Sequence, residues 1–213
     1  MKTDALIDRL ASGTVPVRRN AAALRILAAA VVGSIVALAM IVGLLGVRHD
    51  WHMATMEPVF WVKLLYTGGV ALIALASAAV LARPEAQPPR TLWMLLLPFG
   101  IVAMLAVAEL IATPREHWMP LITGSRVRYC SPDILLFSLP VFAALVFAFR
   151  TLAPTRLRWT GATLGLAAGA LAGVIYCLHC AEDTMTFVTL WYSVGMLLPA
   201  LLGALIGPLV LRW

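Results

Sequence analysis

Three cysteines and their polar neighbours are the residues of this chain best suited to chemistry. Cys130 stands alone, whereas Cys177 and Cys180 lie three residues apart on either side of His179. Thiolates and an imidazole suit soft or borderline cations such as zinc, cadmium or cuprous copper. Cys130 and Cys180 can therefore form either a disulfide, with or without a signalling role, or a thiol pair that reacts with metals or oxidants. Both alternatives require the two cysteines to be close in the fold.

Cys177 belongs to a different pattern. The spacing Cys177-x-x-Cys180 also occurs in thioredoxin-like redox sites, but no βαβ pattern surrounds it here. Cys177 instead continues a series of glycines at intervals of four, which places small residues along one face of a helix. We interpret Cys177 as a packing residue of this stripe, with Gly203 and Gly207 as a matching patch on another helix. The stripe consists of Gly161, Gly165, Gly169 and Gly173.

The composition indicates where these residues are held. The chain has 213 residues, of which 62% are hydrophobic and 12% charged, and its mean hydropathy is +0.94. Soluble domains are about half apolar and about a quarter charged, so this chain cannot cover a globule with polar surface. The same composition excludes extended disorder. The net charge of +6 comes from basic residues scattered between apolar runs, so we predict a lipid bilayer, and no nucleic acid, as a direct partner.

Six apolar stretches are long enough to cross a hydrocarbon core of ~30 Å as helices. We therefore predict an all-α integral membrane bundle of six transmembrane helices over residues 24–213, preceded by a short cytoplasmic segment, residues 1–23. The expected spans are 24–47, 59–82, 92–112, 132–149, 160–179 and 187–211.

The basic residues predict the orientation of the bundle, because Lys and Arg are enriched in cytoplasmic connections. Six spans put both termini on one side, and most of the 16 basic residues lie on that side. Both termini are therefore expected in the cytoplasm of a bacterium, with the protein in its inner membrane and the cysteines near the outer face. The five basic residues on the opposite side are Arg48, Lys63, Arg115, Arg126 and Arg128.

Ionisable residues inside the spans are few. Lys63 and Glu109 are expected near the outer ends of their helices, where we predict that both reach the interface by snorkelling. A small membrane transporter remains an alternative function, although it lacks an ionisable residue at mid-membrane. A periplasm-facing thiol oxidoreductase is a second alternative, but its electron relay would need two cysteine pairs, and the chain has three cysteines.

The N-terminal segment has the pattern of a short amphipathic helix. Thr3 is a plausible N-cap, and Asp4 complements the positive end of the helix dipole. Leu6, Ile7 and Leu10 fall on one side of this helix. So short a helix is marginal alone in water, and its apolar side is suited to docking in a groove of a partner protein.

Several blocks resemble the NrsF family of bacterial membrane anti-sigma factors over nearly the whole chain. Cys130, ahead of a span with a Leu139-Pro140 kink, matches one cysteine of the family. Ala181 stands where we expect proline, and Cys177 is an additional thiol. The other matching blocks are Lys2-Thr3-Asp4-x-Leu6-Ile7-Asp8, Pro16-Val17-Arg18-Arg19, Tyr176-x-x-His179-Cys180-x-Glu182-Asp183, Phe187-Val188 and Trp191-Tyr192.

The resemblance implies a regulator without a catalytic step and without a resident cofactor. Such a protein holds a SigF-like extracytoplasmic-function (ECF) sigma factor at the inner membrane and releases it on heavy-metal or oxidative stress. Cys130 and Cys180 would be the sensing pair, with transient soft-metal binding and His179 as a further candidate ligand. The N-terminal segment would bind the sigma factor through Asp4, Leu6, Ile7, Leu10, Arg18 and Arg19.

Overall fold

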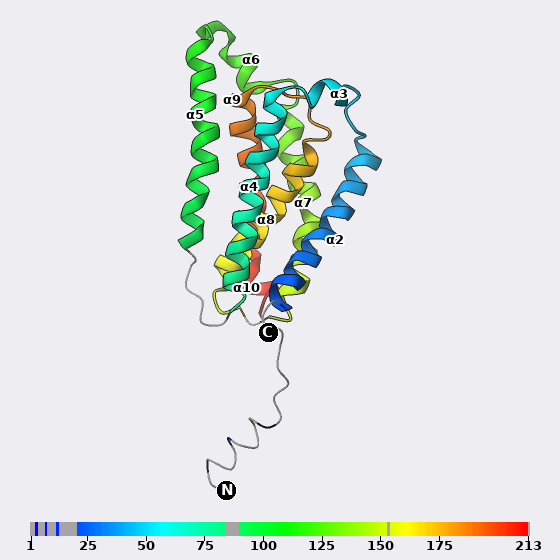
Figure 1. The fold of residues 1–213 in the computed structure, drawn as a ribbon, viewed down its shortest axis with the longest axis vertical. Coiled ribbons are helices and arrows are strands. Elements are labelled where there is room, and N and C mark those ends of the chain that lie inside the picture. The colour runs from blue at the N-terminus through cyan, green and yellow to red at the C-terminus, as the bar shows by residue number, and fades with distance from the viewer. Residues whose placement is uncertain are drawn as a thin grey trace.

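The described residues form an all-α bundle, as the sequence predicts. The computed structural model describes Thr3, Ile7, Ser12 and residues 21–83, 90–152 and 154–212. Six helices in this part of the chain are long and apolar enough to cross a membrane. The long helices of the bundle are α2 (Ala21–Leu44), α4 (Pro58–Leu81), α5 (Leu96–Ala112), α7 (Val127–Phe149), α8 (Leu157–Tyr176) and α10 (Ser193–Val210) (Figure 1).

Short helical elements connect the long helices or extend them. Two of them, η1 and η2, are 3-10 helices, and the π-helical turn η3 leads from α9 directly into α10. The short elements are α3 (Trp51–Ala54), η1 (Arg90–Leu95), η2 (Arg115–His117), α6 (Trp118–Thr123), α9 (Met185–Phe187) and η3 (Val188–Tyr192).

Helix α8 lies at the centre of the bundle, in contact with α10, α4, α7 and α2 (Figure 1). Its glycine stripe lets α10 approach very closely. A Cβ atom added to Gly161 would lie 2.0 Å from the carbonyl oxygen of Gly203, and one added to Gly203 would lie 2.1 Å from the carbonyl oxygen of Gly161. The predicted match between the glycine stripe and Gly203 is therefore confirmed.

Helix α5 is peripheral by comparison. Its only buried residues are Val102 and Ala106, and it stands at the side of the bundle next to α4 (Figure 1). The large apolar side chains that it leaves exposed, such as Met104 and Ile111, suit a surface that faces lipid. The core therefore forms around α8 and not around the third span.

Helix ends differ from the predicted spans at places that matter for the cysteines. Helix α7 begins at Val127 and not at residue 132, so that Pro132 lies inside the helix. Cys130 therefore lies within α7 and not ahead of it. Helix α8 ends at Tyr176 and not at residue 179, so Cys180 lies in the segment between α8 and α9.

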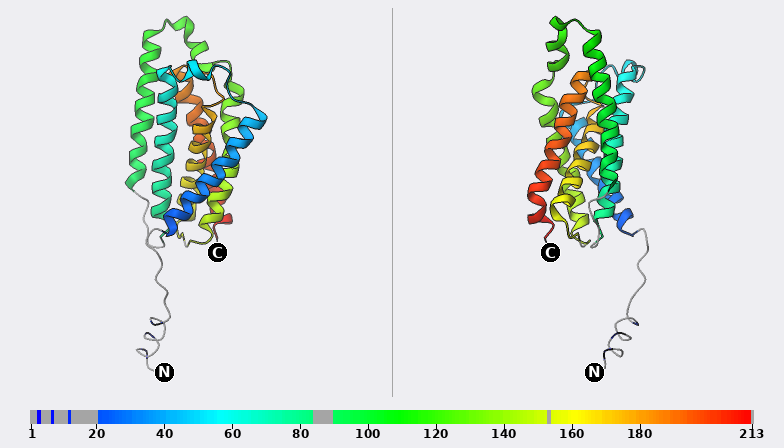
Figure 2. Two further views of the ribbon diagram at one scale, coloured as in Figure 1. Left: turned by 45° about the vertical axis from the view of Figure 1, so that its right-hand side comes forward. Right: turned by 90° about the vertical axis from the view of Figure 1, so that its left-hand side faces the viewer.

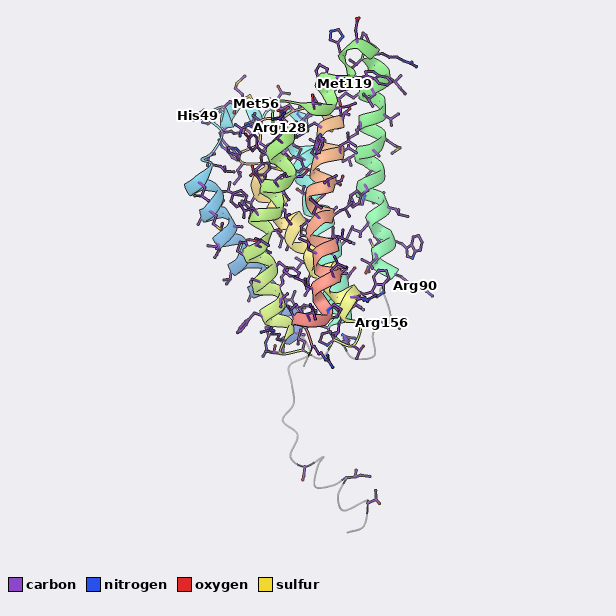
Figure 3. The ribbon with its side chains drawn as sticks, turned by 180° about the vertical axis from the view of Figure 1, so that it is seen from behind. His49, Met56, Arg90, Met119, Arg128 and Arg156 are labelled. Carbon is purple, nitrogen blue, oxygen red and sulfur yellow. The ribbon has the colours of Figure 1, made fainter. Side chains whose placement is uncertain are left out.

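The two ends of the bundle carry different groups of residues. His49, Met56, Met119 and Arg128 lie at one end, and Arg90 and Arg156 lie at the other (Figure 3). Both views of Figure 2 put the start of α2 and the end of α10 at the same end. We call the opposite end, formed by the connections 45–57, 113–126 and 177–184, the thiol end.

The N-terminal segment falls almost entirely outside the described residues. Of the predicted partner-binding residues, only Ile7 is described, and its side chain is exposed. The other five, namely Asp4, Leu6, Leu10, Arg18 and Arg19, lie outside the described residues.

Candidate functional site

Cys130 and Cys180 meet at the thiol end. Cys130 comes from the first turns of α7, and Cys180 comes from residues 177–184, the connection between α8 and α9, which we call the thiol loop. Both side chains are fully buried, and their sulfur atoms are hydrogen-bonded to each other. All three cysteines of the chain are free thiols. The fold thus brings together two thiols that lie fifty residues apart in sequence.

The surroundings of Cys180 favour its thiolate. The Cys130 thiol donates a hydrogen bond to the Cys180 sulfur and lowers the pKa of Cys180 to about 6 against the opposing effect of burial. The backbone N–H of Glu182 and the ammonium group of Lys63 lower this pKa further. The thiolate is the nucleophilic and metal-binding form of cysteine. At neutral pH, Cys180 is therefore largely in its thiolate form, with the Cys130 thiol beside it.

Cys177 has the opposite character. Burial raises the pKa of its thiol to about 11, and its sulfur donates to the carbonyl oxygen of Gly173 at 3.2 Å. A protonated thiol bonded to its own helix is a poor nucleophile. This environment supports the interpretation of Cys177 as a packing residue.

Tyr192 adds a polar group that sequence reasoning did not single out. It ends the π-helical turn η3, a feature often found at functional sites. Its side chain is fully buried, and its hydroxyl group has no hydrogen-bond partner among the described residues. The thiols of Cys180, Cys177 and Cys130 are its ionisable neighbours, so a buried hydroxyl donor without a partner lies beside the thiols.

Lys63 does not reach the interface, so the snorkelling prediction for it is wrong. Its side chain is fully buried, and its Nζ donates to the backbone carbonyl of Glu182 and, at 3.2 Å, to the carboxylate of Asp183. A buried ammonium group is tolerated only with such partners. The partners lie 119 and 120 residues away in sequence, so no local sequence pattern predicts them.

Arg48 is a second buried cation beside the thiol loop. Its guanidinium group binds both carboxylate oxygens of Asp50, at 2.7 and 2.6 Å, and lies 3.7 Å from Asp183. This hydrogen bonding lowers the pKa of Asp50 to about 2. The backbone N–H of Arg48 also donates to the carbonyl oxygen of Leu178 at 3.1 Å, which joins the connection 45–57 to the thiol loop.

Glu109 is also bonded within the protein, and because the residue stays partly exposed, its snorkelling to the interface remains a prediction. Its carboxylate accepts from the backbone N–H groups of Met185 and Thr186, at 3.1 and 2.7 Å, and from the Thr186 hydroxyl at 2.6 Å. These N–H groups begin α9 and have no partner within the helix. The peripheral helix α5 is thereby attached to the residues that follow the thiol loop.

His179 bridges two connections and leaves no ring nitrogen unused. Its Nδ1 lies 2.9 Å from the carbonyl oxygen of Gly46, to which it donates, so its Nε2 accepts from Arg126 at 3.0 Å. Among the described residues, no group of three or more His, Cys, Asp or Glu side chains is placed to hold a metal ion. The structure thus does not assemble Cys130, Cys180 and His179 into one metal site, and binding of a soft metal by the thiol pair stays a prediction.

Glu182 fastens the thiol loop to the connection ahead of α7. Its Oε1 accepts from the backbone N–H of Ser125 at 2.7 Å and from the Ser125 hydroxyl. Gly124 makes this approach possible, since it has φ +52 and a Cβ there would lie 2.7 Å from Oε2 of Glu182. With these contacts, the thiol loop is bonded to both other connections of the thiol end and to α4.

Comparisons with known proteins agree over the full length of the chain. The family model described as "NrsF: Negative regulator of sigma F" matches residues 10–213. The chain is 41% identical to the "Probable anti-sigma-F factor NrsF" of Azospira oryzae and 36% identical to the "Anti-sigma-F factor NrsF" of Caulobacter vibrioides. Each alignment spans 100% of both proteins. Among solved structures there is no match.

Proposed function

This chain belongs to the NrsF family of negative regulators of sigma F, and we propose that it is a membrane anti-sigma factor whose sensor is the pair Cys130 and Cys180. It sequesters a SigF-like sigma factor of the ECF class and releases it when a heavy metal or an oxidant reacts with the two thiols. The full-length similarity supports a regulatory role in place of a catalytic one.

The orientation that this role requires puts both termini in the cytoplasm and the thiol end in the periplasm of the inner membrane. An even number of spans supports this arrangement, since α2 starts and α10 ends at the same end (Figure 2). The excess of basic residues at that end supports it as well.

The contact between Cys130 and Cys180 is the observation that carries the sensing proposal. An oxidant takes two electrons from the pair, a sulfur–sulfur bond forms, and one proton leaves the Cys130 thiol, because Cys180 is already a thiolate at neutral pH. A soft divalent cation bound by both sulfurs displaces the thiol proton and removes the hydrogen bond between them. Either reaction replaces the contact that holds the thiol loop against α7.

The signal must then reach the cytoplasmic side. The thiol loop is bonded to α4 through Lys63 and to both other connections of the thiol end, so a shift of the loop changes the packing of several helices together. Coupling of this kind needs two discrete arrangements of the bundle. In the released arrangement, the cytoplasmic segment that retains the sigma factor no longer holds it.

Residues 1–23 are the proposed contact with the sigma factor. The apolar side formed by Leu6, Ile7 and Leu10 fits helix-in-groove docking, and Asp4, Arg18 and Arg19 would add charged contacts. A membrane tether of this kind keeps the sigma factor away from RNA polymerase without any contact of the anti-sigma factor with DNA.

A pull-down from native membranes tests the binding function. The tagged intact chain is compared with a chain that lacks residues 2–19, and partners are identified by mass spectrometry. We expect a sigma factor with the intact chain and its loss with the truncated one. A sigma factor retained by both chains would move the contact to the cytoplasmic connections, and its absence from both under unstressed conditions would contradict the proposed function.

A further inference from the structure

Lys63 is a buried cation whose hydrogen bonds all go to the thiol loop. Its side chain has an exposed fraction of 0%, and both of its acceptors, the Glu182 carbonyl and the Asp183 carboxylate, follow Cys180 within three residues. Burial of an ammonium group is costly, and loss of one partner of a buried pair costs more than the pair contributes. Movement of the loop away from Lys63 would leave a buried ammonium group without partners and is therefore energetically unfavourable.

The position of Lys63 is itself fixed by the packing of α4 on α8. One turn along α4, the Thr67 hydroxyl donates to the Lys63 carbonyl oxygen at 2.8 Å. The Thr67 methyl group packs against Gly173 of α8, since a Cβ atom added to Gly173 would lie 3.2 Å from it. Helix α4, which carries Lys63, thus packs against α8, which leads into the thiol loop. The Lys63 side chain reaches from α4 to the thiol loop at the end of α8.

Asp183 is shared between two cations, but Lys63 is the closer one. The Lys63 ammonium lies 3.2 Å from Asp183, whereas the Arg48 guanidinium lies 3.7 Å away and has Asp50 as its main partner at 2.6 Å. Arg48 therefore has its main acceptor outside the thiol loop, although its Nη1 atom has no hydrogen-bond partner among the described residues, whereas the acceptors of Lys63 lie within the loop.

We propose that Lys63 is a positioning residue for the sensing pair: its ammonium group, through Asp183 and the Glu182 carbonyl, holds the thiol loop so that Cys180 faces Cys130. This inference rests on the proposed function for the importance of the thiol pair, and it assigns to α4 a part in the sensor. Without Lys63 the loop loses its attachment to α4, and the two sulfur atoms separate.

Crosslinking of the two thiols measures this positioning directly. The full chain carries Cys177→Ser, so that Cys130 and Cys180 are its remaining thiols, and is treated in membranes with dibromobimane, which fluoresces strongly only after both of its bromomethyl groups have alkylated thiols. We expect Lys63→Met to lower the crosslinking yield about tenfold. Lys63→Arg, which keeps the charge and can reach the same acceptors, should restore most of it.

Two further variants separate positioning from general damage. Ser77→Ala removes another buried polar group of α4, whose hydroxyl binds Thr91 at 2.7 Å far from the thiols, and should leave the crosslink unchanged. Asp183→Asn keeps Lys63 but removes its charged acceptor, and should lower the yield. If Lys63→Met does not accumulate in membranes, Asp183→Asn decides the question.

The result that would overturn the inference is a crosslinking yield for Lys63→Met, or for Asp183→Asn, equal to that of the Cys177→Ser parent. Equal losses in Lys63→Met and Lys63→Arg would also overturn it, because they would show a need for shape and not for the ammonium contacts. The readout involves no sigma factor. A chain that binds no sigma factor but loses its crosslink with Lys63→Met would contradict the proposed function and support this inference.

Discussion

Cys177 and Cys180 lie three residues apart yet have opposite chemistry. Cys177 is bonded to the carbonyl of its own helix, whereas Cys180 accepts from the Cys130 thiol and lies near the Lys63 ammonium. The difference arises because α8 ends at Tyr176, so Cys177 still follows the helix while Cys180 has turned toward α7. The local ending of a helix therefore decides which thiol is reactive.

The reactivity of Cys180 should depend on pH in a predictable direction. Because its pKa is lowered to about 6, the thiolate is present above that pH and is lost as the pH falls through it. Alkylation at Cys180, followed by mass spectrometry of its peptide, should have its midpoint near pH 6. Since the hydrogen bond from Cys130 is the largest cause of the shift, Cys130→Ala, which removes the donor, should raise the midpoint by about one pH unit or more.

Cys177 serves as the internal control of that measurement. Its pKa is raised to about 11, so alkylation at Cys177 should stay low across the neutral range in every variant. A Cys180 midpoint that does not move with Cys130→Ala would refute the hydrogen bond as the cause of its lowered pKa.

At the scale of helices, the glycine stripe sets how closely α8 and α10 pack. Gly161 faces the backbone of Gly203, and backbone cannot move aside as a flexible side chain can. The stripe and its partner were predictable from sequence because spacing of four is a local pattern. The depth of the contact depends on two helices together and emerges only from the fold.

Replacement of Gly161 by alanine should destabilise the bundle by about 1–3 kcal/mol, because the added methyl group forces the two backbones apart. Gly68 on α4 is the matched control, since a Cβ there meets nothing within 4 Å. Gly68→Ala should be neutral or stabilising by up to ~1 kcal/mol through helix propensity. Thermal unfolding of the purified protein in detergent compares the two, and similar melting temperatures would contradict the packing argument.

Sequence reasoning located the six helices but did not find the partners of the ionisable residues at their ends. Apolar length is a local property, so the spans followed directly from composition. The partners of Lys63 and Glu109 come from the segment 182–186, and no pattern along the chain relates residues so far apart. From the sequence, the proximity of Cys130 and Cys180 was only a condition that both interpretations of the pair required. The fold fulfils this condition.

At the scale of the whole molecule, many hydrogen bonds join the connections at the thiol end, whereas α2 begins and α10 ends at the opposite end. The thiol loop is bonded to both other connections of the thiol end and to α4, so the proposed sensing pair lies beside a loop that joins several helices. This arrangement explains how a reaction at two sulfur atoms can alter the bundle as a unit.

The proposed orientation predicts which end can be labelled from outside the cell. In a chain with all three cysteines replaced by serine, Met56→Cys places a thiol at the thiol end and Arg156→Cys places one at the other end (Figure 3). Both positions are exposed. A membrane-impermeant maleimide added to cells with a permeable outer membrane should label position 56 and not position 156. The reverse pattern would contradict the orientation.

Release of the sigma factor from membranes tests the central claim most directly. Membranes that carry the intact chain and its bound sigma factor are exposed to cadmium or to the thiol oxidant diamide, and the sigma factor left in the membrane fraction is measured. The intact chain and Cys177→Ser should release it, whereas Cys130→Ser/Cys180→Ser should bind it normally and retain it. Equal release from the doubly substituted chain would show that the pair Cys130 and Cys180 is not the sensor.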